Sequence, residues 1–180
     1  MKTLETEKLL LRGWQKSDFE AVHAYASNPA NVIFMGWGPN TEKDTRKFIK
    51  LSIKWNKKNA EEYSYAVILK DSGKLIGGGS ISINQSRNEA SLGWILHKDY
   101  WKQGLGTQMA RELIRFGFEE LNLRRIYATC DGENYGSYRI MERNGMRKEA
   151  HFIKKRKCGD SWHDEFLYAI LKEEWENSQL

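Results

Sequence analysis

The hydrophobic positions of this chain follow two periods, and the places where one gives way to the other predict its elements. Apolar residues spaced three or four apart indicate an amphipathic helix, whereas alternation or a short apolar run between turn residues indicates a strand. The first pattern predicts helices over residues 17–27, 41–55, 105–116 and 137–144. The second predicts strands over residues 3–13, 63–70, 75–83, 89–96 and 124–130, with two closing strands near Phe152 and Phe166. The chain is therefore expected to be α+β, without repeats or linkers.

Turn and cap residues support several of these boundaries. Ser17-Asp18-Phe19-Glu20 fits a capping box at a helix start, and Asn28-Pro29 is expected to break the helix that follows. Thr41 is the expected cap of the next helix. Asp71-Ser72-Gly73-Lys74 is typical of a hairpin turn, and Asn144-Gly145 is typical of a helix stop with a left-handed glycine.

One glycine-containing segment points to a ligand. Gly104-Leu105-Gly106 lies between a predicted strand and a predicted helix. The first N–H groups of a helix have no intrahelical acceptor and carry a partial positive charge, so a phosphate-bearing ligand fits there. A Walker A loop is excluded because Gly-Lys-Ser/Thr does not occur, and a Rossmann loop needs a third glycine where Met109 stands. A tight turn without a ligand is the alternative.

Composition narrows the setting further. The 180 residues suit one domain over residues 1–180 with a sizeable core. The net charge of +5 suits an anionic ligand or an acidic partner and does not demand nucleic acid. No apolar run approaches the roughly 20 residues of a membrane span, and no signal peptide is evident, so a cytoplasmic location is expected. The two cysteines and four histidines lack disulfide or metal spacing, so no metal is expected.

A second motif follows the strand that ends at Cys130. Asn134-Tyr135-Gly136-Ser137 opens a helical pattern, after the earlier Trp101-Lys102-Gln103-Gly104-Leu105-Gly106 and with a strand between the two. In this order the motifs resemble those of the GNAT superfamily of acyl-CoA-dependent N-acyltransferases. Trp101 departs from the superfamily's Arg/Gln, as is usual in the branch that contains ribosomal-protein N-terminal acetyltransferases. Residues 4–12, 92–101 and 164–175 also look like that branch.

The resemblance implies a fold and a cosubstrate. The fold would be the GNAT fold, a mixed and mostly antiparallel twisted sheet of about seven strands flanked by about four helices. Acetyl-CoA would lie in a cleft where the strands ending near Leu96 and Cys130 splay apart. The pantetheine arm would pair with the first of these strands as an added strand does.

The resemblance also implies which residues hold acetyl-CoA. A side chain at either glycine of the loop would obstruct the close approach of its backbone to phosphate. The candidates are Trp94, Ile95 and Leu96 for the pantetheine arm, Gln103, Gly104, Leu105, Gly106 and Thr107 for the pyrophosphate, Lys102 for a CoA phosphate, and Asn134 and Ser137 at the start of the later helix.

Attack of an amine on a thioester calls for a base and for an acid that protonates the leaving thiolate. Many relatives use a tyrosine as the acid, but Met141 stands at that position, so Ser137 becomes the candidate and Tyr138 the reserve. A purely capping role for Ser137 stays open. The relatives' usual base is replaced by Ser91, and Glu89 should share its strand face, with a surface carboxylate as the alternative interpretation.

The acceptor is the least determined part. The resemblance favours a protein N-terminal α-amine of the ribosomal-protein type, and the alternative is a small amine such as an amino acid, a polyamine or an antibiotic. Trp37, in a Gly/Pro-containing segment, is the candidate for lining the acceptor pocket, against ordinary packing. An acidic pocket would favour polyamines.

A third hypothesis is a non-catalytic acyl-CoA-binding or ribosome-associated module, because Met141 and Ser91 replace the usual acid and base. The cluster Lys154-Lys155-Arg156-Lys157 is interpreted as a solvated hairpin tip, with docking to RNA or to a ribosomal surface as the alternative. Direct binding of nucleic acid or of a membrane is not expected, and homodimers are common among relatives.

Overall fold

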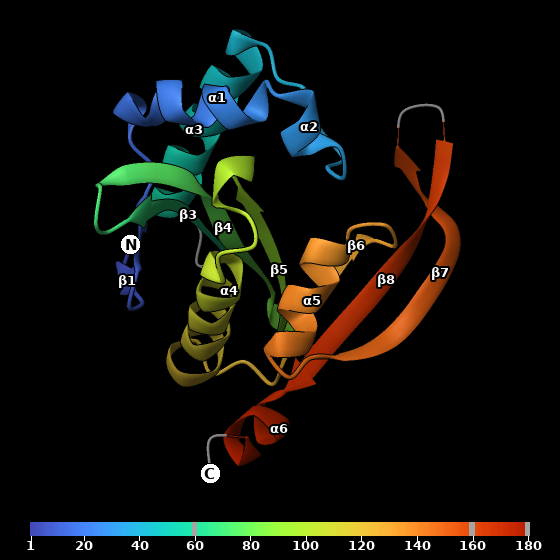
Figure 1. Cartoon of the computed structure of the whole chain (residues 1–180). Coiled ribbons are helices and arrows are strands. Elements are labelled where there is room, and N and C mark those ends of the chain that lie inside the picture. The colour runs from blue at the N-terminus through green and yellow to red at the C-terminus, as the bar shows by residue number, and fades with distance from the viewer. Residues whose placement is uncertain (59–60, 159–160, 179–180) are drawn as a thin grey trace.

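The computed structural model describes residues 1–58, 61–158 and 161–178, and its centre is an eight-stranded sheet (Figure 1). The strands, in chain order, are β1 (Leu4–Glu5), β2 (Leu9–Gly13), β3 (Glu62–Leu69), β4 (Lys74–Asn84), β5 (Glu89–Leu96), β6 (Arg125–Asp131), β7 (Arg147–Cys158) and β8 (Ser161–Leu171). Their order across the sheet is β1-β2-β3-β4-β5-β6-β8-β7. Neighbouring strands are antiparallel except β5 and β6, which are parallel.

Six α-helices surround the sheet within the described ranges. They are α1 (Phe19–Ala26), α2 (Pro29–Val32), α3 (Glu42–Lys58), α4 (Leu105–Arg115), α5 (Tyr135–Arg143) and α6 (Lys172–Asn177). None of these helices is both long and apolar enough to cross a membrane.

The helices form a layer on each face of the sheet. Alternation along β3 buries Tyr65 and Val67 in one core, with side chains of α4 and α5, and Ala66 and Ile68 in the other, with side chains of α1 and α3. A strand that is buried on both faces explains the nearly continuous apolar run of this segment. In Figure 1, α4 and α5 accordingly lie on the opposite side of the sheet from α1 and α3.

The sheet opens in its middle. The parallel pairing of β5 with β6 involves only Glu89, Ala90 and Ser91 on β5, and it stops there. Beyond Ser91, β5 stays paired with β4 and β6 stays paired with β8, so the two strands separate. The splay that the resemblance implied is present, and it divides the sheet into two halves.

The structure corrects two expectations about the first third of the chain and adds a short helix to a third. Residues 3–13 form two strands joined by a turn, since Leu4 pairs with Leu11. Asn28 and Pro29 break the first helix as expected but also begin α2, where the Asn28 side chain accepts the Ala30 N–H at 3.0 Å. The capping box expected at Ser17 is absent, because Asp18 accepts the Gln15 N–H and forms a two-bond pair with the Arg12 guanidinium.

Candidate active site

A cavity of about 740 Å³ passes through the splay between β5 and β6. Its walls come from both helical layers: α1 and α3 on one side, the N-terminus of α5 on the other, with β4, β5, the end of β6 and part of β7 between them. The volume lies in the range of small-molecule sites. A cavity that reaches both faces of the sheet allows two substrates to approach each other from opposite sides.

On the α5 side, Ser137 is held by two partners. Its backbone N–H donates to the Asn134 side chain at 3.1 Å, so Asn134 is the N-cap of α5. Its hydroxyl oxygen accepts the indole Nε1–H of Trp94, on β5, at 3.2 Å. All three residues line the cavity. Because an indole nitrogen only donates, this contact leaves the Ser137 hydroxyl proton available for another acceptor.

The free edge of β5 is where an added strand would pair. His97 N–H donates to the Ile76 carbonyl, and the Ile95 carbonyl lies against Gly77, so these residues face β4. In an antiparallel strand, neighbouring residues alternate in direction, which turns the backbone groups of Trp94 and Leu96 toward the splay. Trp94 and Leu96 therefore present backbone groups at this free edge, whereas the backbone groups of Ile95 are directed toward β4.

The N-terminus of α4 offers the amides expected for a pyrophosphate. The first helical hydrogen bond of α4 runs from Gln108 N–H to the Gly104 carbonyl, so the amides of Leu105, Gly106 and Thr107 have no acceptor within the helix. Gly104 has a φ of 77°, a conformation that glycine adopts without strain. These residues lie outside the lining of the cavity, beside the end of β5.

The two loop glycines are needed for different reasons. A Cβ on Gly104 would meet nothing within 4 Å, so its backbone conformation is the constraint. A Cβ on Gly106 would lie 2.6 Å from Cδ1 of Ile140 on α5 and 3.7 Å from Cδ1 of Leu96. The second glycine therefore allows close packing of α4 against α5, a reason that the loop motif alone did not indicate.

Side chains around this loop hold it in place. Trp101 donates its Nε1–H to the Leu96 carbonyl at 2.8 Å, and Gln103 donates to the Asp99 carbonyl at 2.9 Å. The buried Asn31, on α2, donates to the same Leu96 carbonyl at 2.8 Å and accepts the Lys98 N–H at 2.9 Å. Lys102 is exposed, so its side chain is accessible to a charged group of a ligand.

Two of the predicted catalytic residues lie elsewhere. Glu89 is at the paired end of β5, five residues and about 17 Å along the strand from Trp94. Its carboxylate lies 3.5 Å from Arg125 Nε and 3.8 Å from Arg87 Nη1, and it is not part of the cavity lining. Tyr138 is also absent from the lining and packs edge-on against Phe166 and Tyr135. The geometry therefore fits Glu89 as a largely buried ion-pair partner and Tyr138 as a packing residue.

The α1–α3 side of the cavity has aromatic walls. Trp37, from the loop after α2, lines it together with Trp14, Tyr25, Phe34 and Phe48. Trp14 reaches the cavity because glycine occupies position 78, where an added Cβ would lie 2.9 Å from the indole ring. The run of three glycines at 77–79, inside a predicted strand, was the available sequence signal for this close approach.

The basic cluster lies near the end of the β7–β8 hairpin, where Arg156 pairs with His163 and Lys157 with Trp162. Its residues belong to β7, and Arg156 is half-buried and lines the cavity. Its Nη2 donates to the Phe34 carbonyl at 2.9 Å, which ties β7 to the loop that carries Trp37. The sequence analysis missed Arg156 because four basic residues in a row gave no sign that one of them faces inward.

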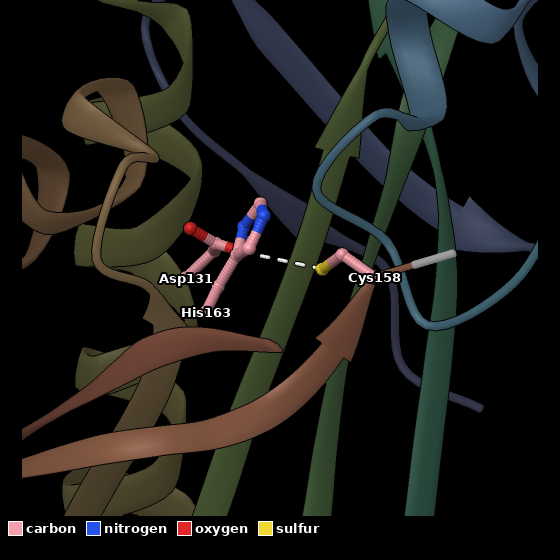
Figure 2. Close-up of side chains that lie close together, drawn as sticks. All are labelled: Asp131, Cys158 and His163. Carbon is pink, nitrogen blue, oxygen red and sulfur yellow. Dashed lines mark hydrogen bonds and ion pairs between the residues drawn. The ribbon is translucent and has the colours of Figure 1, made fainter. Parts of the chain in front are cut away.

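A buried acidic group lies near Arg156. Asp131, at the end of β6, is 0% exposed and accepts a hydrogen bond from Glu133 N–H. It also accepts hydrogen bonds from His163 Nδ1 and Cys158 Sγ, and Figure 2 shows these three side chains together. Donor atoms of Asp131, Cys158 and His163 lie within 4.8 Å of one another, a set that sequence spacing did not reveal. These three donors offset the cost of burying the Asp131 carboxylate.

A cavity-lining thiol is chemically quiet. Burial raises the pKa of Cys130 to about 12. Arg156 lowers this pKa by a smaller amount, and Asp131 raises it slightly further. The thiol is therefore protonated near neutral pH, and a nucleophilic role for Cys130 has no support from its surroundings.

Comparison with known proteins places this geometry in a family. The Acetyltransferase (GNAT) domain family matches residues 8–147. The chain is 37% identical over 172 residues to an uncharacterized N-acetyltransferase of Bacillus subtilis, YnaD, covering 96% of this chain and 98% of that protein. A GNAT-family acetyltransferase structure from Bacillus anthracis is 35% identical with a TM-score of 0.87, covering 96% of this chain and 99% of that one. A complex of the ribosomal L7/L12 α-N-protein acetyltransferase RimL with coenzyme A has a TM-score of 0.85, covers 94% of this chain and 98% of that one, and at 20% identity is similar in fold.

Proposed function

Because the chain belongs to the GNAT acetyltransferase family and is an acetyl-CoA N-acetyltransferase, we propose that it acetylates a primary α-amine by direct attack in a ternary complex, with Ser137 as the proton donor. The observation that carries this proposal is the Trp94–Ser137 contact across the splay. It holds a hydroxyl in the wall of the cavity with its proton free to be donated.

Different residues would bind the two parts of acetyl-CoA and transfer the proton. The amides of Leu105, Gly106 and Thr107 would hold the pyrophosphate, and the edge groups of Trp94 and Leu96 would align the pantetheine arm. Acetyl-CoA, when bound, supplies the thioester that the amine attacks. The N–C bond forms as the C–S bond breaks, and the amine nitrogen gives up one proton to water. The departing thiolate takes the proton of Ser137 Oγ, and a proton from solvent then restores the hydroxyl.

We propose that no protein base deprotonates the acceptor amine and that its neutral form is supplied by its own acid–base equilibrium in solution. Asp44, a carboxylate that lines the cavity, has a pKa held below its ordinary value by hydrogen bonds from Thr41, which makes it a weak base. We therefore expect the neutral fraction of the amine to attack. An α-amine has a pKa near 7.7–8.0, so kcat/KM should rise with pH up to about 8 and then level off. A plateau that begins near pH 6 instead would indicate a protein base.

The acceptor class is proposed as an α-amine of a peptide. The fold-level likeness to RimL supports this class, since that protein is described as acting on a ribosomal-protein α-amine. A cavity that is open to both faces of the sheet could admit the end of a chain. A small amine remains the alternative, and transfer to free amino acids in preference to peptides would favour it.

A thermal-shift measurement with ligands tests whether the protein binds acetyl-CoA, on which the rest of the proposal depends. Acetyl-CoA at about a hundredfold over its Kd should stabilise the protein by about 2.7 kcal/mol, a rise of about 5–10 °C for a chain of this length. ATP and NADH are the matched controls and should give no rise. Stabilisation by acetyl-CoA followed by CoA release with a peptide amine would support catalysis. Stabilisation without release from any amine would favour the acyl-CoA-binding module.

A further inference from the structure

We propose that the acceptor amine also carries a carboxylate, and that Arg156 is the residue that binds it. This inference rests on the proposed acetyl transfer and narrows the substrate class of the same site. It starts from Arg156, which is the one arginine among the cavity-lining residues within the described part of the chain.

Arg156 lies on the side of the sheet away from α5. It is paired with His163 on β8, and directly opposed residues share a face. Phe166, three positions further along β8, packs on Tyr138 of α5 and therefore lies on the other face. The hydrogen bond from Arg156 to the Phe34 carbonyl also shows that Arg156 faces the loop after α2. Acetyl-CoA would approach from the α4 and α5 side, so Arg156 is placed to meet the second substrate.

The guanidinium has binding capacity left. The Phe34 carbonyl takes one of its five N–H donors, and Glu165 lies 3.5 Å from Nη1. Glu165 also accepts a 2.7 Å hydrogen bond from Lys155, so one carboxylate is shared by two cations. A planar guanidinium with donors to spare suits the two oxygens of a ligand carboxylate.

The other charges of the cavity lining point the same way. Among the described residues of the lining, Lys47 adds a second cation, and the one acidic residue, Asp44, already accepts two hydrogen bonds from Thr41 as part of the α3 cap. A polyamine would bring several positive charges into a cavity with two cations, which is unfavourable in a site of low dielectric constant. An amine with a carboxylate presents the opposite sign to Arg156 and an ordinary nucleophile to the thioester.

The test measures CoA release with acceptors that share one amine. C-terminally amidated Ala-Asp-Ala, Ala-Asn-Ala and Ala-Lys-Ala differ in the charge of one side chain, and Ala-Ala-Asp-amide moves the carboxylate by one residue. Free aspartate tests a small-molecule source of the same chemistry, and spermidine tests the polyamine class. We expect kcat/KM for the better aspartate-containing acceptor to exceed that for the asparagine peptide by about tenfold, equal to 1.4 kcal/mol. Equal use of these acceptors, or a preference for lysine or spermidine, would overturn the inference.

Variants assign the effect to Arg156. Arg156→Gln should abolish the preference, and Arg156→Glu should reverse it toward the lysine peptide. Arg156→Lys keeps the charge and retains part of the preference, which serves if the first two variants fold poorly. Lys157→Gln is the matched control, because Lys157 is the exposed neighbour on the other face of β7 and should leave the ratio unchanged.

The Kd of acetyl-CoA, measured by calorimetry, distinguishes a failure of the Arg156 inference from a failure of the proposed acetyl transfer. An unchanged Kd in Arg156→Gln, together with loss of the acceptor preference, supports the inference. A weakened Kd for acetyl-CoA would overturn it by placing Arg156 at the cosubstrate. No binding of acetyl-CoA by the unmodified protein would remove the proposed function itself. Binding without transfer to any of these acceptors would count against the carboxylate-bearing class.

Discussion

The two sides of the cavity are built in different ways. The α4 and α5 side comes from one continuous segment, from β5 to the end of α5, and its central contacts join Trp94 to Ser137 and Gly106 to Ile140. The α1 and α3 side is assembled from distant segments, as the bond of Arg156 to the Phe34 carbonyl illustrates across 122 positions. A ligand of fixed structure can be served by a short local motif, whereas the acceptor site is free to vary because separate segments shape it.

The largest effect is expected at Ser137. Replacing Ser137 by Ala removes the proton donor and should lower kcat about 100-fold, at the low end of general acid catalysis, with little change in the Kd of acetyl-CoA. Trp94→Phe keeps the hydroxyl but removes the hydrogen bond that positions it, so kcat should fall about fivefold, or about 1 kcal/mol. Steady-state kinetics and calorimetry on both variants check this order. A serine that only caps α5 would instead lose melting temperature and keep kcat.

Gly104 tests the loop of the first side. Gly104→Ala forces a side-chain-bearing residue into the left-handed conformation, at a cost of about 1–2 kcal/mol, and the loop should relax away from its ligand-ready shape. We expect the Kd of acetyl-CoA to rise about tenfold while the acceptor preference stays the same. Gly73→Ala has the same backbone penalty in a hairpin turn far from the cavity lining and is the matched control. If both variants bind acetyl-CoA equally well, the loop assignment is wrong.

The sequence predicted the locally built side of the cavity better than the side that is assembled from distant segments. Most strands and the helix start at Asn134–Ser137 were predictable because each depends on a pattern within a short stretch, whereas the splay was expected only from the family resemblance. The distance of Glu89 from the cavity could not be predicted, because alternation gives the face of a strand but not the position along it, and the strand pairs with β6 at that end. Trp37 was predicted and lines the cavity, but Arg156 and the other aromatic side chains were missed because their placement depends on contacts between strands and loops that are far apart in sequence.

Substitution of Gly106 should have a smaller effect on stability, and a second substitution should reverse it. A Cβ at this position meets only Cδ1 of Ile140 at short range, the far end of a flexible side chain. Gly106→Ala should therefore lower the melting temperature by a few degrees, about 1 kcal/mol for a modest overpacking. Ile140→Val removes that carbon, and the double variant should recover most of the loss. Additive losses in the double variant would mean that the first turn of α4, and not its contact with α5, needs the glycine.

Glu89 gives the smallest expected effect and the sharpest contrast with the cavity. It belongs to an ion-pair chain at the paired end of the sheet, in which Arg125 also holds Glu149 through two hydrogen bonds. The Arg125 guanidinium lowers the pKa of Glu149, so this pair stabilises the fold at neutral pH and loses that contribution as pH falls through the lowered pKa. Glu89→Gln and Glu149→Gln should each cost under about 1 kcal/mol at pH 7 and leave kcat unchanged. Loss of kcat in Glu89→Gln, with Glu149→Gln unaffected, would restore Glu89 as a base acting from outside the cavity.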